Sequence, residues 1–331
     1  MSRCAVIGAG AWGTALADLL SRNGHDTRIW AYEWDVVESI NRSHVNRRFL
    51  AGHPLSDTLV AFNSMEGALE DADMVTLATP SHVLRTIVRS AKPFIKPGVP
   101  VVVASKGIEP ETLALMTDVA SEELPESTVV ALSGPSFASE VVAQQPTAVV
   151  VASTSEYAAL FAQQSFSSAH FRAYTHSDVT GVEIGGSLKN VMAVATGIAD
   201  GLGLGFNARA ALITRGLAEM TRLGVKLGAE ASTLAGLAGL GDLVLTCTGS
   251  LSRNRSVGVE VGRGTALDVV LAGRETVAEG VTTARSAFAL AKREGVEMPI
   301  VDAVHKVLFE GQAARDAIGA LMTRELRPES D

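Results

Sequence analysis

Cysteines, aromatic residues and an excess of basic charge are scarce or missing in this sequence. Its 331 residues include two cysteines, Cys4 and Cys247, in unrelated segments without metal-ligand spacing. This excludes a disulfide scaffold and indicates two free thiols in a reducing compartment. Lysine and arginine number 28 against 36 acidic residues, a net charge of −8, and aromatic residues make up 5%. A general nucleic-acid binder needs clustered basic residues, so this class is excluded too.

The sequence also shows no leader peptide and no membrane span. Met1-Ser2-Arg3 runs directly into an apolar strand pattern, without a basic region, apolar core and small-residue cleavage site. No apolar run approaches the roughly 18 residues of a membrane helix. We therefore expect a cytoplasmic protein.

What the chain does contain is enough apolar material for about two folded domains. Hydrophobic residues make up 47%, and mean hydropathy is +0.23. Over residues 3–175, β-branched runs alternate with helix-like segments, which predicts a doubly wound α/β domain. The predicted strands cover residues 4–7, 27–30, 58–62, 74–78, 100–104, 128–132, 147–151 and 171–174. Several are continuous apolar runs, typical of parallel strands buried on both faces.

From about Asp178 the pattern changes to apolar residues at intervals of three and four, which predicts helices. The predicted domains are therefore a dinucleotide-binding domain at 1–177 and a helical substrate-binding and catalytic domain at 178–331. The boundary rests on this change of period alone.

A glycine-rich loop, Gly8-Ala9-Gly10-Ala11-Trp12-Gly13, follows the first predicted strand and opens a helix pattern. Glycines at these places permit a tight turn, close approach of the backbone to a pyrophosphate and close helix packing, while the helix N-terminus attracts the anion. We therefore predict a dinucleotide site here. A second glycine-rich segment, residues 201–205, follows a helical pattern and is interpreted as an interhelical loop.

Glu33 lies 20 residues past Gly13, at the end of the second predicted strand, where an acid accepts hydrogen bonds from the ribose 2′-OH. This position favours NAD(H). Two alternatives stay open: a solvated acid at a helix start, and a site in which Tyr32 or Arg28 tolerates a 2′-phosphate.

Lys189 is the candidate proton donor for reduction of a carbonyl. It stands in an otherwise apolar helical segment just past the domain boundary, after Gly185 and Gly186, which permit close approach of a cofactor. A desolvated lysine releases its proton more readily than one in water. The alternative is a lysine that extends into solvent.

Three further segments suit an anionic substrate. Ser252-Arg253-Asn254 puts a cationic fork beside an amide, as phosphate or carboxylate binding requires. Residues 133–138 and 105–107 each follow a predicted strand, and such loops line the crevice of an open α/β sheet. Turns without function are the alternative for both loops.

The chain closely resembles the bacterial NAD(P)-dependent glycerol-3-phosphate dehydrogenases from residue 3 to about 310. The resemblance is carried, in this order, by GAGAWGTALA, TPSH, SKGIE, SGPSFASEV, EIGGSLKNV, NARAALITRGLAEM, LAGLGDLVLTCT, SRNR, VAEGVTTA and MPIV. It implies a Rossmann domain, a helical domain like that of 6-phosphogluconate dehydrogenase, and an active site between them. The implied reaction is reversible hydride transfer between NAD(P)H and dihydroxyacetone phosphate, giving sn-glycerol 3-phosphate, a precursor for glycerophospholipid synthesis.

The resemblance also implies roles for single residues. Lys189 would accept a proton in alcohol oxidation and donate it in the reverse direction. The expected substrate-binding residues are Lys106, Gly134, Ser136, Lys189, Asn190, Asp242, Ser252, Arg253 and Asn254. With the glycine loop and Glu33 included, the expected cofactor-binding residues are Gly8, Gly10, Ala11, Trp12, Gly13, Tyr32, Glu33, Lys106, Ala138, Arg253, Val277 and Glu279. No metal is required.

Several points stay open. Asp242 either orients a lysine by hydrogen bonding or caps a helix. Residues 46–52 depart from the family pattern at Phe49 and Ala51, which leaves the role of this loop undecided. The sequence does not decide between NAD and NADP, nor the oligomeric state, for which a homodimer is one option, nor feedback inhibition by glycerol 3-phosphate. Two competing functions are a β-hydroxyacid dehydrogenase and a redox sensor that binds the dinucleotide without turnover.

Overall fold

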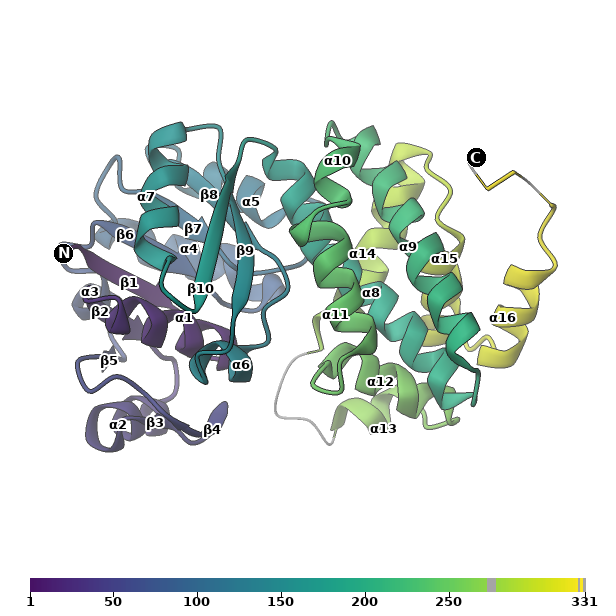
Figure 1. Cartoon of the computed structure of the whole chain (residues 1–331), viewed down its shortest axis with the longest axis horizontal. Coiled ribbons are helices and arrows are strands. Elements are labelled where there is room, and N and C mark those ends of the chain that lie inside the picture. Colours follow the sequence, from purple (N-terminus) through teal and green to yellow (C-terminus); the bar gives the residue numbers. More distant parts are fainter. Residues whose placement is uncertain (273–277, 327, 330–331) are drawn as a thin grey trace.

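The chain folds into a sheet-containing half and a helical half that lie side by side (Figure 1). The computed structural model describes residues 1–272, 278–326 and 328–329. The last strand of the sheet ends at His176, and the long helix α8 (Val179–Gly201) begins the second half. A cavity between the halves can therefore receive side chains from both.

One eight-stranded sheet forms the centre of the first half, in the order β10-β9-β8-β7-β6-β1-β2-β5. Its strands are β1 (Arg3–Ile7), β2 (Asp26–Trp30), β5 (Val60–Phe62), β6 (Met74–Leu77), β7 (Val101–Val103), β8 (Val129–Ser133), β9 (Thr147–Ala152) and β10 (Phe171–His176). All eight predicted strands are present, with bounds that differ by two residues or fewer. The six strands from β5 to β8 are parallel in Rossmann order, which confirms the predicted fold.

The direction of β9 differs from the prediction, because β9 is antiparallel to β8. Val149 and Val151 belong to the core beneath α1, while Val150 and Ala152 pack against Val182 of α8. An apolar run indicates burial on both faces, and here the helical half provides the second covering layer. Burial alone therefore carried no information about strand direction.

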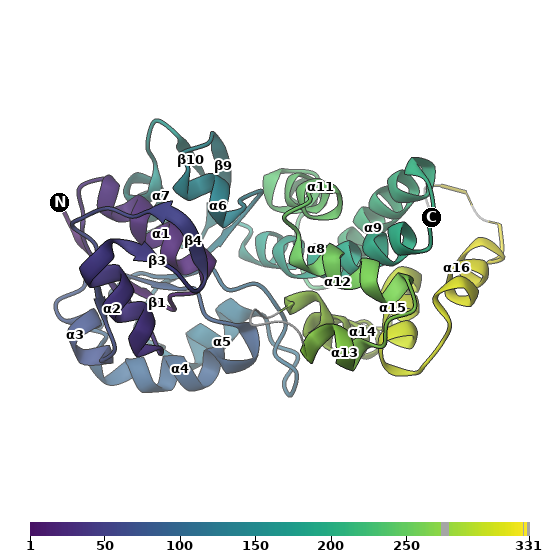
Figure 2. The same cartoon turned by 90° about the horizontal axis from the view of Figure 1, so that it is seen from below.

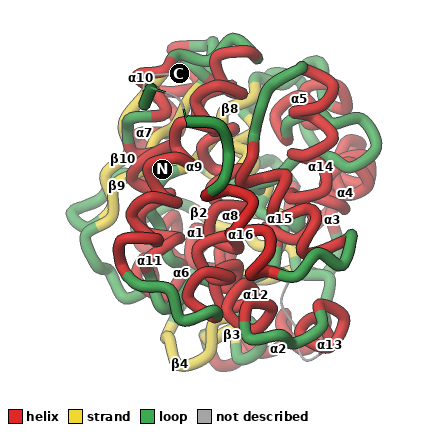
Figure 3. The backbone as a smooth tube through the Cα atoms, turned by 90° about the vertical axis from the view of Figure 1, so that its right-hand side faces the viewer, coloured by secondary structure: helices red, strands yellow, loops and turns green. Residues whose placement is uncertain are grey.

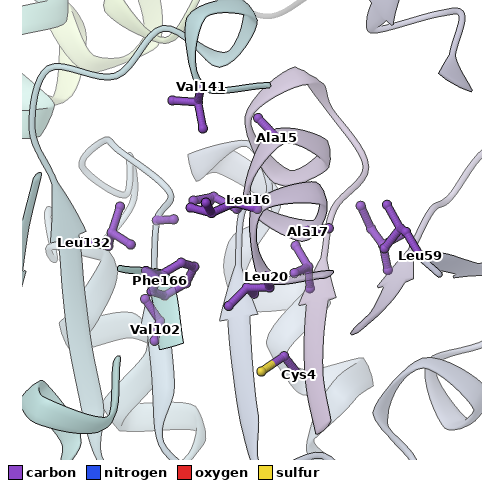
Figure 4. Close-up of a cluster of buried hydrophobic side chains, with 14 of the residues drawn as sticks. Cys4, Ala15, Leu16, Ala17, Leu20, Leu59, Val102, Leu132, Val141 and Phe166 are labelled. Atoms are coloured by element: carbon purple, nitrogen blue, oxygen red, sulfur yellow. The ribbon is translucent and has the colours of Figure 1, made fainter. Parts of the chain in front are cut away.

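Helices cover both faces of the sheet, because successive side chains of each strand point to opposite faces. One face carries α1 (Ala11–Arg22) and α7 (Glu156–Phe166), and the other carries α3 (Met65–Leu69), α4 (Leu84–Ala91) and α5 (Met116–Glu123). Figure 4 shows Leu16 and Leu20 of α1 and Phe166 of α7 beside the sheet residues Val102 and Leu132. This packing holds α1, and with it the glycine loop, against the sheet.

A short hairpin, β3 (Val45–Asn46) and β4 (Leu50–Pro54), follows α2 (Trp34–Ser43) and was not predicted, since so short a pair shows no alternation of apolar and polar residues. The buried Asn46 side chain donates to the carbonyl oxygen of Ala9 at 2.8 Å and to the Thr14 hydroxyl at 2.8 Å. The hairpin, which contains the atypical segment 46–52, is thereby tied to the glycine loop.

The described part of the second half is helical, as predicted, and seen from this end the tube is mostly red (Figure 3). Besides α8 it contains α9 (Phe206–Lys226), α10 (Ala231–Leu234), the π-turn η3 (Leu237–Gly241), α11 (Asp242–Thr248), α12 (Arg253–Gly262), α13 (Leu267–Ala272), α14 (Glu279–Glu294), α15 (Pro299–Phe309) and α16 (Ala314–Met322). The first half adds η1 (Ser81–Val83), η2 (Lys92–Phe94) and α6 (Ala138–Val142). Residues 202–205 join α8 to α9, so the second glycine-rich segment is the predicted interhelical loop.

One segment among the described residues, Ala231–Thr248, is long and apolar enough to cross a membrane, with a mean hydropathy of 1.3 over 18 residues and 44% of them buried. The expectation that no apolar run reaches this length is therefore too strict. Leu234, Leu243 and Cys247 lie in the core of the helical half. Packing within the protein accounts for the apolar character of this segment. Cys4 and Cys247 are both free, as predicted, and both are buried.

Candidate active site

A cavity of about 600 Å³ lies between the two halves. Fifteen of the predicted site residues line it: Gly8, Gly10, Ala11, Trp12, Tyr32, Glu33, Lys106, Ser136, Ala138, Lys189, Asn190, Ser252, Arg253, Asn254 and Glu279. Gly13, Gly134 and Asp242 do not line it, but each contacts a residue that does. Val277 lies outside the described residues. The fold thus gathers residues from both halves around one space.

The three loop glycines have three different surroundings. A Cβ on Gly8, which has φ +109°, would lie 2.8 Å from the Ala78 carbonyl oxygen, and a Cβ on Gly13 would lie 1.9 Å from the Gly8 carbonyl oxygen. A Cβ on Gly10 would meet nothing within 4 Å. The first and third glycines therefore serve the turn and the helix packing, while the second leaves its backbone open to the cavity.

These surroundings fit a dinucleotide. Gly10 precedes helix α1, whose first N–H groups have no partner within the helix and favour an anion. The indole N–H of Trp12 is buried and has no hydrogen-bond partner in the described structure. A polar ligand bound at this wall could accept hydrogen bonds from the open backbone and from the unpaired indole N–H.

Glu33 lies at the N-cap of α2, but its side chain makes no capping hydrogen bond, so the carboxylate is available to the cavity. Tyr32 is 77% exposed beside it. Arg28 donates to the Gly67 carbonyl oxygen at 2.8 Å and pairs with Glu70 at 3.0 Å. Because Arg28 is occupied there, it is a poor candidate for binding a 2′-phosphate.

Three charged side chains meet at the other end of the cavity. Asp242 is fully buried, and its two carboxylate oxygens separately accept hydrogen bonds from Lys189 Nζ at 2.5 Å and Lys106 Nζ at 2.7 Å. Asp242 is the first residue of α11, and the hydrogen bonds that its carboxylate accepts in the described structure come from side chains and not from N–H groups of the helix. Of the two roles left open for Asp242, orientation of a lysine is therefore the one that the structure shows, and it serves both lysines.

Lys189 is buried in α8, so the alternative of a lysine extended into solvent is wrong. Burial, aided by the charge of Lys106 and opposed by that of Asp242, lowers the pKa of Lys189 to about 8. A lysine with this pKa exchanges its proton near neutral pH. The geometry and the charge both suit proton transfer to and from an oxygen in the cavity.

The two glycines before Lys189 face protein and not the cavity. A Cβ on Gly185 would lie 2.3 Å from the Ala238 carbonyl oxygen, and one on Gly186 would lie 2.5 Å from the Ser133 hydroxyl. The expectation that they permit approach of a cofactor is therefore replaced by a packing role. They allow η3 and the end of β8 to contact α8 closely.

A cationic group lies near the start of α12. Arg253 makes no hydrogen bond or ion pair with a side chain in the described structure, and it lines the cavity. Asn254 donates to the Asn190 side-chain oxygen at 2.8 Å and accepts from the Gly280 N–H at 2.9 Å. The amide thereby joins α8, α12 and α14, while the guanidinium stays available for a phosphate at the helix N-terminus.

The two serines expected to bind the substrate form hydrogen bonds within the protein. The Ser252 hydroxyl accepts the Arg255 N–H and caps α12. The Ser136 hydroxyl donates to the Gly134 carbonyl oxygen at 3.0 Å, which also accepts from Lys106 at 3.4 Å. Gly134 therefore supports Lys106 from behind the cavity wall.

Glu279 connects the two halves. Its carboxylate accepts hydrogen bonds from the Ser81 N–H at 3.1 Å and from the Ser81 hydroxyl at 2.5 Å, across 198 positions of sequence. Ser81 belongs to the TPSH segment after β6. Glu279 thus stands in the cavity wall at the point where the halves touch.

Sequence reasoning missed other residues of the cavity wall. Thr246 donates to the Asp242 carbonyl oxygen at 2.6 Å and lines the cavity. It follows Asp242 by four positions in α11, so helical spacing could have indicated it. Phe49 of the atypical segment also lines the cavity, which places that loop beside the glycine loop.

Two family models together match most of the chain. The model described as "NAD-dependent glycerol-3-phosphate dehydrogenase N-terminus" matches residues 3–159, and the model described as "NAD-dependent glycerol-3-phosphate dehydrogenase C-terminus" matches residues 178–319.

Curated proteins and solved structures are similar over nearly the full length. The "Glycerol-3-phosphate dehydrogenase [NAD(P)+]" of Geobacter sulfurreducens is 54% identical over 330 residues, which cover 99% of this chain and 98% of that protein. The protein of the same name from Syntrophotalea carbinolica is 53% identical, with 98% and 99% covered. The crystal structure of glycerol-3-phosphate dehydrogenase from Coxiella burnetii has a TM-score of 0.94 at 40% identity, with 98% and 99% covered.

Proposed function

The chain belongs to the family of NAD-dependent glycerol-3-phosphate dehydrogenases, and we propose that it reduces dihydroxyacetone phosphate to sn-glycerol 3-phosphate with Lys189 as the proton donor. The observation that carries the assignment of roles is the buried Lys106–Asp242–Lys189 cluster, which shares one cavity with Arg253. A proton donor and a phosphate-binding cation thus line one cavity.

The substrate is a small dianion, so each end of it needs a different partner. Arg253, the second amide hydrogen of Asn254 and the N-terminus of α12 would bind the phosphate. Lys106 would donate a hydrogen bond to the carbonyl oxygen and offset the negative charge that develops there. Asp242 would orient the ammonium groups of both lysines toward the carbonyl oxygen of the substrate.

Lys189 would transfer its proton to the carbonyl oxygen in reduction and take it back in oxidation. The bound nicotinamide supplies or accepts the hydride at the carbonyl carbon. Asp242 stays paired with Lys106 while Lys189 exchanges its proton, so the loss of one proton from the cluster never leaves the buried carboxylate unpaired. The wall formed by Gly10, Trp12 and Glu33 would hold the nucleotide at the opposite end of the cavity.

The two competing functions fit these residues less well. A β-hydroxyacid dehydrogenase accounts for Lys189 but leaves Arg253 and the α12 N-terminus without a phosphate. A sensor without turnover leaves the buried lysine pair without a task, although its charges are costly to bury.

Four wider expectations go with this proposal. We place the domain division at 177/178, supported by the end of β10 at His176 and the start of α8 at Val179. A homodimer, a cytoplasmic location and a reaction without metal stay predictions. The described residues contain no group of three or more histidine, cysteine or acidic side chains arranged to hold a metal ion.

The direct test measures oxidation of NADH and of NADPH, separately, with dihydroxyacetone phosphate as substrate. Turnover with the phosphorylated ketone, and little with unphosphorylated dihydroxyacetone or a 3-hydroxyacid's keto form, supports the proposal. Turnover with the carboxylate substrate alone would assign the β-hydroxyacid reaction. No oxidation with any of them would favour the sensor.

A further inference from the structure

Lys106 belongs to the sheet-containing half by sequence, yet the segment after it packs into the helical half. Residues 107–115 form an arm between β7 and α5, closed by an antiparallel bridge between Ile108 and Leu115. Ile108 is fully buried and Leu115 is 7% exposed, and both lie in the hydrophobic core of the helical half. In Figure 2 the arm leaves the sheet and reaches the side of the helices.

The start of the arm is hydrogen-bonded to the helix that carries Lys189. The buried Ser187 hydroxyl of α8 donates to the Gly107 carbonyl oxygen at 3.0 Å. Gly107 is the residue after Lys106, and Ser187 stands two positions before Lys189. One hydrogen bond from a side chain of α8, the helix that carries Lys189, therefore reaches the backbone next to Lys106.

The start of the arm contacts α8 on one side and Ser81 of the sheet-containing half on the other. A Cβ on Gly186 would lie 3.5 Å from Cδ of Lys106, so the Lys106 stem lies on α8. A Cβ on Gly107 would lie 2.5 Å from Cβ of Ser81. Glycine at position 107 therefore lets the start of the arm pass close to Ser81, where a side chain would not fit.

The tip of the arm is held in a costly conformation. Leu113 has φ +61°, which a leucine rarely adopts, and it packs against the same helical core. Arg293 of α14 donates to the Thr112 carbonyl oxygen at 3.2 Å, and Arg85 of α4 binds the Glu109 carboxylate at 2.7 Å. Contacts from both halves therefore maintain the arm: Ile108, Leu113 and Leu115 pack in the helical half, and Ala114 packs against the core of the sheet-containing half.

We propose that Ser187 and Ile108 are positioning residues that act through Lys106: the helical half, by binding the arm, fixes Lys106 on Asp242 beside Lys189. This inference rests on the proposed function, since it gives Lys106 its place at the carbonyl oxygen. Ser187 and Ile108 would then affect turnover by holding the arm in place, without contacting the substrate.

A double-mutant cycle between Ser187→Ala and Lys106→Met separates this effect from loss of stability. Ser187→Ala alone should lower kcat/KM for dihydroxyacetone phosphate about tenfold, with the KM for NADH unchanged, because a buried carbonyl oxygen loses its donor and the lysine loses its place. In the Lys106→Met background Ser187→Ala should have no further effect on kcat/KM. An equal tenfold loss in both backgrounds would overturn the proposal.

Ile108→Ala and Ile300→Ala form the matched pair for the apolar contact, because both isoleucines are buried in the helical core. Both variants should lose thermal stability, and only Ile108→Ala should lose kcat/KM. If Ile108→Ala fails to fold, Ile108→Val with Ile300→Val takes its place. Equal kcat/KM values for the two variants would contradict the proposed role.

Hydrogen–deuterium exchange tests the arm without turnover. Exchange in the peptide covering residues 105–115 should rise in Ser187→Ala and stay at the parent's level in Ile300→Ala. A parent without activity on dihydroxyacetone phosphate would refute the proposed function, and this exchange difference would still decide whether α8 holds the arm. Unchanged exchange in Ser187→Ala would show that it does not.

Discussion

At the nucleotide end of the cavity the groups come mainly from the start of the chain, whereas at the catalytic end they come from segments up to 136 positions apart. The nucleotide end presents backbone and partly exposed side chains around Gly10 and Glu33. The catalytic end presents buried charges, which are stabilised because Asp242 pairs with both lysines. Removal of a single side chain should therefore lower activity far more at the catalytic end, where each charge depends on its neighbours.

Lys189→Met should show the largest effect. The substitution keeps the length of the side chain and removes its proton, so turnover should fall by a factor on the order of 10²–10⁴, the range for one general acid or base. The affinity for NADH should barely change, because Lys189 lies at the other end of the cavity. Steady-state kinetics and NADH titration measure the two quantities, and near-normal turnover would remove Lys189 from the mechanism.

Arg253→Ala should raise the KM for dihydroxyacetone phosphate by roughly 10²-fold, because a desolvated phosphate loses a charge-assisted pair. Arg263→Ala, at the exposed far end of the same helix, is the matched control and should leave KM unchanged. Unphosphorylated dihydroxyacetone should be a poor substrate for all three proteins. Equal KM values for parent and Arg253→Ala would refute the phosphate site.

Gly10→Ala tests the nucleotide end by filling space that the protein itself leaves empty. A Cβ there meets no protein atom within 4 Å, so the fold should tolerate it, while the dissociation constant for NADH should rise about tenfold or more. Gly319→Ala in α16 also meets nothing within 4 Å and should keep the parent's affinity. Fluorescence titration with NADH measures both. Unchanged affinity in Gly10→Ala would place the nucleotide elsewhere.

Glu33→Gln should have the smallest effect. An ionised acid here would accept hydrogen bonds from the ribose and repel a 2′-phosphate, so its loss should narrow the ratio of kcat/KM for NADH over NADPH by about tenfold or less. Glu38→Gln, on the same helix outside the cavity, should leave the ratio unchanged. A parent enzyme that already prefers NADPH would contradict the assignment of Glu33 to the ribose.

The two ends of the cavity also differ in how much of them could be predicted from the sequence. The glycine loop, its strand and its helix are contiguous, and local rules for turns and periodicity identified them together with Glu33. The pairing of Asp242 with two lysines and the contact of Ser81 with Glu279 depend on how distant segments meet, which no local pattern encodes. The sequence left a lysine open as the partner of Asp242, but it did not show that two lysines share this carboxylate or that Ser81 pairs with Glu279. The predicted direction of β9 was wrong for the same reason, because the layer that covers this strand comes from the other half.

The pH dependence of catalysis tests the central claim most directly, namely that the buried Lys189 carries the proton. The pKa of Lys189 is lowered to about 8, and its protonated form is needed for reduction. The logarithm of kcat/KM for dihydroxyacetone phosphate should therefore be level below pH 8 and fall as pH rises through it, while oxidation of glycerol 3-phosphate should rise through the same pH. Lys189→Met should lose this inflection. An inflection that persists in Lys189→Met, or a parent profile that stays level to pH 10, would contradict the account.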